Sequence, residues 1–216
     1  MCSSPQERDP HLVDPEEALW KASNKVLGFV AEIYGKPEHV PEQRTIPVEN
    51  KMTLTLGKLK FTTLPTPGHA SHHICIFLQP QEVIFTGDAA GIYTPSLDVV
   101  LPATPPPFRL SPALKSIRKL IALKPKLIAY THFNISPNAV PNLQKHYDQL
   151  LIWHESAKEI VAKGILDEEE MLELIAERDN DLKKFLTASE KLGGLRRGVK
   201  TGLRGFLELD TEKSTL

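Results

Sequence analysis

Three short apolar segments of this chain each run into a loop that carries a side chain able to bind metal. His69 follows a segment that alternates apolar and polar residues, Asp88 follows residues 83–86, and His132 follows residues 127–131. Short runs of this kind predict β-strands, and an α/β fold places its chemistry where strands stop and loops begin. The segments therefore predict an α/β fold in which His69, Asp88 and His132 meet at one edge of a sheet.

The spacing of apolar residues predicts the remaining elements. We expect, in chain order, a helix at 14–35, a hairpin of strands 52–56 and 59–62, strands at 74–78, 83–86 and 127–131, a helix between 111 and 125, and helices at 138–164, from 167 and at 181–192. Asp14 is the expected N-cap of the first helix, and Gly35 and Gly164 are expected helix ends. Because strands 74–78 and 83–86 are nearly all apolar, we expect both of their faces to be covered.

Composition and charge exclude several classes of protein. The 216 residues suffice for one large domain, and the net charge of −1 provides no field that would attract nucleic acid or an anionic membrane. The sequence has no apolar run of about 18 residues and no apolar core for a signal peptide near its first residue. Cys2 and Cys75 do not form a disulfide framework, and Cys75 lies in an apolar run that predicts a buried thiol. We expect a cytoplasmic protein that binds neither nucleic acid nor membrane.

The remaining histidines and the basic segment have more ordinary interpretations. At least one of His72 and His73 is expected in the core or behind a metal ligand, where it would orient that ligand. Four others are not expected to bind metal: His11, His39, His146 and His154. The basic residues at 196–204 alternate with apolar residues at helical spacing, which favours a solvated helix face. We expect the proline-rich loop 102–107 to border the site.

The three motifs together resemble a known family. Residues 66–69 read Thr-Pro-Gly-His, residues 85–88 read Phe-Thr-Gly-Asp and residues 131–132 read Thr-His, and the metal-binding residues are 19 and 44 positions apart (69 to 88 to 132). In order and spacing they resemble the third, fourth and fifth motifs of the metallo-β-lactamase superfamily, over residues 14–165. Among its members, the chain looks most like metallo-hydrolases related to glyoxalase II. The order of elements is similar to the C-terminal half of that family's αβ/βα sandwich, with additional C-terminal helices.

The resemblance implies two divalent metal ions, zinc above all, with iron or manganese as alternatives. By position, His69 would bind the first ion, Asp88 would bridge the two and act as the catalytic residue, and His132 would bind the second. Imidazoles suit zinc and iron as terminal ligands, and a carboxylate can share its two oxygens. The implied activity is hydrolysis of a small-molecule thioester, ester or related substrate by a metal-bound hydroxide.

One motif of that family is missing from this sequence. The signature His-x-His-x-Asp-His, which supplies the other ligands, occurs nowhere in the chain. We therefore expect an N-terminally truncated copy: residues 1–13 disordered or clipped, residues 14–165 a partial metallo-β-lactamase domain, and residues 166–216 a helical extension.

Two hypotheses of different classes follow. The first is a metal-dependent hydrolase that is missing its N-terminal half. The alternative is a non-catalytic remnant or binding module that retains the half-fold. Either way, part of the sheet would lack its cover, so we expect exposed apolar surface and either self-association or a partner that supplies the missing half.

Overall fold

The computed structural model describes residues 15–38, 40–48, 50–188 and 193–211, and it divides the chain into two compact units. The first unit is Met1–Pro47 and the second is Val48–Leu216. No helix in the described ranges is long and apolar enough to cross a membrane.

The first unit contains short helices. They are α1 (Pro15–Leu27), α2 (Phe29–Tyr34) and the 3-10 turn η1 (Glu42–Arg44). The single helix predicted at 14–35 is therefore wrong, because Gly28 between α1 and α2 has φ 55° and ψ −129°, far from helical values. The predicted end at Gly35 is confirmed, whereas the Asp14 cap lies outside the described residues.

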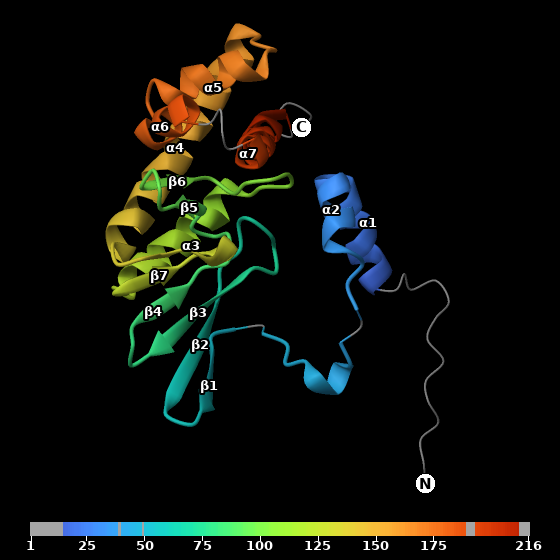
Figure 1. The fold of residues 1–216 in the computed structure, drawn as a ribbon, viewed down its shortest axis with the longest axis vertical. Helices are drawn as coiled ribbons and strands as arrows, with labels where there is room; N and C mark the ends of the chain where they lie inside the picture. The colour runs from blue at the N-terminus through green and yellow to red at the C-terminus, as the bar shows by residue number, and fades with distance from the viewer. Residues whose placement is uncertain (1–14, 39, 49, 189–192, 212–216) are drawn as a thin grey trace. The chain divides into compact units, whose positions relative to one another are not determined.

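The second unit is built on a mixed six-stranded sheet (Figure 1). Its strands, in spatial order, are β1 (Met52–Leu56), β2 (Leu59–Pro65), β3 (Ile74–Gln79), β4 (Val83–Phe85), β7 (Leu127–Ala129) and β8 (Ile135–Ser136). All neighbours are antiparallel except β4 and β7, which are parallel. The predicted hairpin and the strands β3, β4 and β7 are confirmed, and the fold is an α/β arrangement around a mixed sheet. A separate ribbon of β5 (Ile92–Thr94) and β6 (Val99–Leu101) was not predicted.

The two faces of the sheet differ. One face carries a row of buried residues that lie opposite one another in register: Thr62, Phe77, Ile84, Ile128 and Ser136. We call the opposite face the outer face, and it carries two rows: Leu54, Phe61, Leu78, Val83 and Leu127, and then Met52, Thr63, Ile76, Phe85, Ala129 and Ile135. Ten of these eleven side chains are apolar, yet Phe85 is 41% and Ile135 63% exposed. The prediction that β3 and β4 are covered on both faces is therefore wrong, because the described helices of this unit pack on the first face only.

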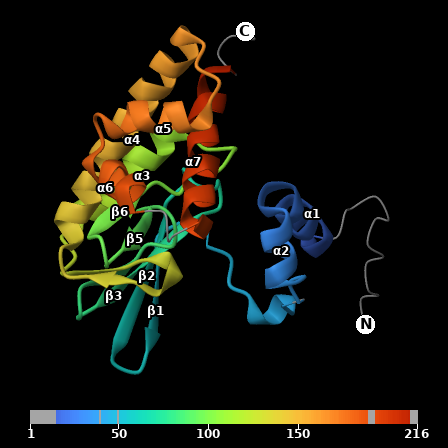
Figure 2. The ribbon, with the colours of Figure 1, turned by 45° about the horizontal axis from the view of Figure 1, so that its top comes forward.

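The described helices of this unit lie on the buried side of the sheet. They are α3 (Leu110–Ala122), α4 (Ala139–Lys163), α5 (Glu168–Ala176), α6 (Asn180–Ala188) and α7 (Gly193–Thr211). Buried residues of α3 to α7 and of the sheet form one hydrophobic cluster, in which Phe206 of α7 packs against Phe108 and against Trp153 of α4. The turn end of the β1–β2 hairpin projects beyond these helices (Figure 2). The predicted helix end at Gly164 is confirmed, and so is the predicted helix start at 167, where Asp167 is the N-cap of α5.

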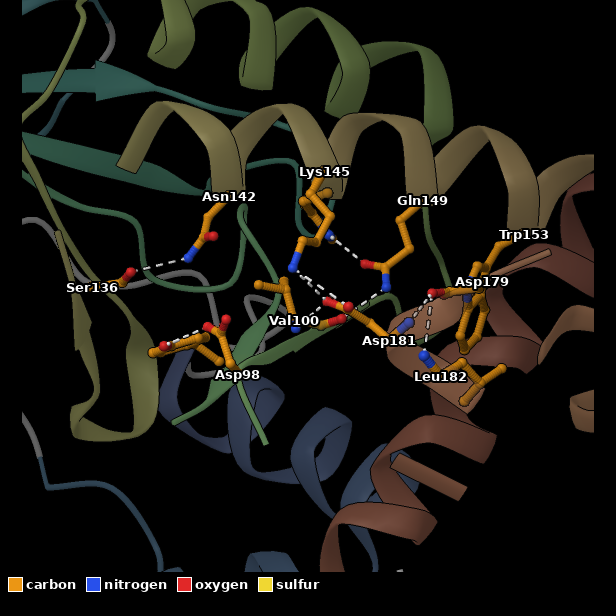
Figure 3. Close-up of polar contacts among 12 residues, drawn as sticks. Asp98, Val100, Ser136, Asn142, Lys145, Gln149, Trp153, Asp179, Asp181 and Leu182 are labelled. Atoms are coloured by element: carbon orange, nitrogen blue, oxygen red, sulfur yellow. Dashed lines mark hydrogen bonds and ion pairs between the residues drawn. The ribbon is translucent and has the colours of Figure 1, made fainter. Parts of the chain in front are cut away.

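A buried polar network joins α4 and α6 to β6 (Figure 3). The Asp181 carboxylate accepts the backbone N–H of Val100 at 2.8 Å and forms an ion pair with Lys145 at 3.1 Å. Asp179 accepts the indole N–H of Trp153 at 2.7 Å. These bonds satisfy carboxylates that are almost fully buried, as burial requires.

The basic segment of α7 also has a partner. Arg196 and Lys200 form ion pairs with Glu169, and Arg204 pairs with Glu168 at 2.8 Å, in the first turn of α5. Val199 and Phe206 on the other side of α7 are buried. The predicted helical spacing is confirmed, and the basic face binds the glutamates of α5 rather than facing solvent alone.

Candidate metal site

The structure brings the three predicted residues together. His69 lies in the turn that leaves β2, Asp88 lies just beyond β4, and His132 lies in the 3-10 turn η2 (Thr131–Phe133) beyond β7. Asp88 Oδ2 lies 4.0 Å from Nε2 of His69, and Asp88 Oδ1 lies 3.9 Å from Nε2 of His132. The carboxylate therefore stands between the two imidazoles and presents one oxygen to each.

A backbone carbonyl determines how His69 faces this carboxylate. Its Nδ1 lies 2.7 Å from the carbonyl oxygen of Ala103, which can only accept a hydrogen bond, so Nδ1 carries the proton. In the neutral ring, Nε2 then directs its lone pair toward the carboxylate of Asp88. Nε2 of His69 and Oδ2 of Asp88 are then both acceptors, 4.0 Å apart, and a positive charge between them would be attracted to both. This is the tautomer that a metal-binding histidine adopts when its second nitrogen is held by a carbonyl.

The distances fit ions that lie between the ligands. Zinc bonds of about 2.0–2.2 Å in tetrahedral geometry separate two ligand atoms by about 3.4 Å. The observed separations of 4.0 and 3.9 Å exceed that by about half an ångström, which a small side-chain rotation removes. Among the described residues, each of the two positions nevertheless has only one histidine and a share of Asp88. Accordingly, across the ranges that the structure describes, no group of three or more His, Cys, Asp or Glu side chains is arranged to hold a metal ion.

His132 has an unusual backbone conformation. Its φ of 67° and ψ of 27° lie in the left-handed region, which non-glycine residues rarely adopt, and Phe133 after it has φ 69°. The turn is closed by the Tyr130 N–H, which donates to the Asn134 carbonyl at 2.8 Å. Backbone strain of this kind persists where the surrounding structure enforces it, commonly at functional sites. It leaves the His132 side chain half-exposed beside Asp88.

His73 lies behind the site rather than in it. The backbone N–H of Asp88 donates to its Nε2 at 3.2 Å, and its Nδ1 lies 2.8 Å from the hydroxyl of Thr66. Burial lowers the pKa of His73, and the neighbouring His69 lowers it further. Of the two adjacent histidines, His73 therefore contacts a predicted ligand, whereas His72 is exposed.

A narrow cavity extends inward from the site. The space open to the centre of a water-sized sphere is about 10 Å³, roughly enough for one water molecule. Its lining includes His69, Asp88, Ala103, Thr104 and, from α4, His146. His146 is fully buried, and burial lowers its pKa to about 4. No sequence signal marks His146 or Ala103 as neighbours of the site, because Ala103 acts through its backbone and His146 is brought in by α4.

Among the other residues considered from the sequence, His154 lies further along α4, and His11 and His39 fall outside the described residues. The proline-rich loop does border the site, as expected, through Ala103 and Thr104. Cys75 is fully buried, as predicted, and burial raises the pKa of its thiol to about 12.

Comparison with known proteins identifies relatives. The profile of the Metallo-beta-lactamase superfamily matches residues 4–132. A metallo-beta-lactamase fold-containing protein of Sulfurisphaera tokodaii, ST1585, is 32% identical over 157 residues, which are 72% of this chain and 58% of the relative.

Solved structures agree on the fold. The crystal structure of ST1585, from Sulfolobus tokodaii, aligns with a TM-score of 0.61 and 25% identity over 89% of this chain and 64% of that one. The metallo-beta-lactamase family protein TTHA1429 of Thermus thermophilus aligns with a TM-score of 0.53 and 19% identity, over 93% and 62%. This chain thus spans about three fifths of the length of the relatives it matches.

Proposed function

Since this chain belongs to the metallo-β-lactamase superfamily, we propose that it is part of a metal-dependent hydrolase whose ions are held by His69, Asp88 and His132. One observation carries the proposal. The Asp88 carboxylate presents Oδ2 to one imidazole and Oδ1 to the other, at 4.0 and 3.9 Å, as a residue shared between two ions must. Imidazole and carboxylate are ligands that zinc, iron and manganese all accept, and zinc is the first candidate.

The residues of this chain have separate tasks in that mechanism. Bound divalent ions would supply Lewis acidity, lowering the pKa of water and polarising the substrate's carbonyl group. His69 is held in the required tautomer by Ala103, and the turn at residues 130–134 holds His132 with its ring at the surface. Because the inner cavity has room for about one water, the substrate must approach from the open side, where His132 is exposed. We propose a small-molecule thioester or ester, as in hydrolases related to glyoxalase II.

We also propose that this chain supplies half of an αβ/βα sandwich and half of the ligands. Three observations support this proposal: each proposed ion position has two ligands among the described residues, the outer face of the sheet is apolar, and the chain spans 58–64% of its relatives' length. A second chain segment that covers the outer face would bury its apolar residues and bring the remaining ligands. A partner or a second copy of this chain is one source of such a segment.

Metal content tests the first proposal. The chain is purified without chelator or histidine tag, and its zinc, iron and manganese are counted by mass spectrometry. The wild type is measured in its native assembly, with any subunit that copurifies, and we expect it to contain bound metal. Asp88→Asn keeps the shape of the side chain but removes its negative charge, so we expect the metal to be lost. Asp148→Asn, an exposed carboxylate on α4, should keep the wild-type content. Metal retained in Asp88→Asn would refute the assignment.

A wild type with less than about a tenth of an ion per chain, even in its assembled form, would favour the alternative, a non-catalytic remnant or binding module. The observation behind that alternative is that, among the described residues, each position has only two ligands.

The outer face can be tested by hydrodynamics. An apolar face of this extent on a lone monomer favours association, so we expect the wild type to sediment as a self-associated species or with a partner. Replacing both Phe85 and Ile135 by Thr keeps the strand propensity of these positions but makes the outer face more polar. We expect this double variant to sediment as a monomer. Leu166→Thr changes an exposed apolar residue outside the sheet and should leave association unchanged. A wild type that is monomeric at every concentration would contradict the proposal.

A further inference from the structure

We infer that His73 is a positioning residue, which fixes the Asp88 carboxylate between His69 and His132 by holding the turn that carries it. The inference rests on the proposed function, because it assigns His73 a task toward the same metal site. It is carried by a closed set of hydrogen bonds around Gly87, in which the donor and the acceptor of each bond can be identified.

The direction of these bonds begins at the Asp88 backbone. Its N–H can only donate, so Nε2 of His73 accepts at 3.2 Å and carries no proton. The neutral ring must then carry its proton on Nδ1, which donates to the hydroxyl oxygen of Thr66 at 2.8 Å. His73 thus uses both nitrogens at once, one as acceptor and one as donor.

The bonds continue back to the strand that precedes Asp88. The Thr66 hydroxyl, having accepted from His73, has one proton to donate, and its nearer acceptor is Sγ of Cys75 at 3.2 Å, with the His73 carbonyl oxygen at 3.5 Å. The Cys75 thiol in turn donates to the carbonyl oxygen of Thr86 at 3.3 Å. The chain of contacts therefore starts at Asp88 and ends at Thr86, on either side of Gly87.

Gly87 leaves the space that the imidazole occupies. Its φ of 51° lies in the left-handed region, and a Cβ at this position would stand 2.6 Å from Nε2 of His73. The ring is thus seated against the backbone of the turn, where only glycine allows it to approach. Since β4 ends at Phe85, the direction in which Asp88 leaves the sheet is set by this contact.

Two substitutions separate the functions of the two nitrogens. In His73→Gln the side-chain amide reaches the position of Nε2, so it can still accept from the Asp88 N–H. In His73→Asn the amide reaches only the position of Nδ1. It therefore keeps the hydrogen bond to the Thr66 hydroxyl and loses the hydrogen bond from the Asp88 N–H. Both variants remove the imidazole and retain one polar contact, which makes them matched controls for each other.

The first readout needs no metal. Hydrogen exchange of the Asp88 amide should accelerate about tenfold or more in His73→Asn and stay near the wild-type rate in His73→Gln, because the hydrogen bond protects the amide. The exchange rate of the Val100 amide, which donates to Asp181 from β6, reports on global stability. This rate should change to the same extent in both variants. Equal exchange of the Asp88 amide in the two variants would overturn the inference.

The second readout is zinc affinity, measured by competition with a chromophoric chelator. Wild type and variants are compared in the native assembly in which each is purified. Loss of an outer hydrogen-bond partner typically weakens metal binding 10–100-fold, so we expect that loss in His73→Asn and a smaller one in His73→Gln. Equal zinc affinity in the two variants, with wild-type zinc binding intact, would also overturn the inference. A wild type that binds no zinc would instead refute the proposed function, and the exchange rates would still decide whether His73 holds Asp88.

Discussion

Gly205→Ala is expected to destabilise the protein by about 3 kcal/mol, the upper end of the usual penalty for overpacking. A Cβ at position 205 of α7 would stand 1.9 Å from the carbonyl oxygen of Thr104 and 3.1 Å from Cβ of Phe108. The obstacle is a backbone carbonyl, so no side-chain rotation relieves it, and the helix or the loop must move. The free energy of unfolding from urea denaturation measures the loss.

The same helix provides a control of opposite sign. Gly198 is exposed and sits in the helix interior, and a Cβ added there would meet nothing within 4 Å. Gly198→Ala should therefore stabilise the protein by about 0.5–1 kcal/mol, because alanine loses less conformational entropy in a helix. Destabilisation by both substitutions to the same extent would show that the close approach at Gly205 is not what matters.

The effect of Gly205→Ala should reach the metal site. Thr104 is tied to α7 by its hydroxyl, which donates to the Gly202 carbonyl at 3.0 Å, and its neighbour Ala103 accepts from Nδ1 of His69 at 2.7 Å. A shift of Thr104 therefore displaces the carbonyl that selects the His69 tautomer. We expect zinc affinity to fall in Gly205→Ala and to remain at the wild-type level in Gly198→Ala.

The strands and the three central side chains were predictable from local pattern. Alternation within residues 52–62 predicts the hairpin, and His69, Asp88 and His132 each follow a run of strand-forming residues. Because β4 and β7 are parallel neighbours, the loops that follow them emerge at the same edge of the sheet. Short-range sequence was sufficient to predict which strand ends carry these side chains, whereas their orientation depends on contacts with other segments.

Other features depend on tertiary contacts that no local pattern records. The apolar character of β3 and β4 predicts two covered faces, but only the packing of the helices decides that Ile84 is buried while Phe85 is not. Ala103 approaches His69 through a carbonyl, which any residue would provide. The role of His73 depends on Cys75, two positions along β3, and on Thr66 in the preceding turn, so it becomes visible only when both segments are in place.

His146 should make the protein sensitive to mild acid. It lies fully buried on α4, and its Nδ1 donates to Oε1 of Gln149, whose amide nitrogen in turn donates to the Val100 carbonyl. Burial lowers the pKa of His146 from its ordinary value of 6.5 to about 4. Between pH 6.5 and about pH 4, His146 is therefore protonated in the unfolded chain but neutral in the folded protein. Protonation thus favours the unfolded chain, and folding stability falls as the pH drops through this range.

The size of this loss follows from the width of the window. Each pH unit between the two pKa values contributes 1.36 kcal/mol, so about 3 kcal/mol is lost between pH 6.5 and pH 4 and none above that range. His146→Asn keeps a donor for Gln149 and removes the titrating group. Its stability at neutral pH should fall because of the smaller side chain, but its decline with acid should be shallower than that of the wild type by about 3 kcal/mol.

Urea denaturation at several pH values between 7.5 and 4 measures this difference on metal-free protein. The pKa of His73 is also lowered by burial, and the pKa of Asp179 is raised by it, but both groups are present in both proteins and cancel in the comparison. Parallel stability curves for the wild type and His146→Asn would mean that His146 accepts its proton in the folded protein as readily as in the unfolded chain, and that water reaches its ring through the cavity behind Asp88.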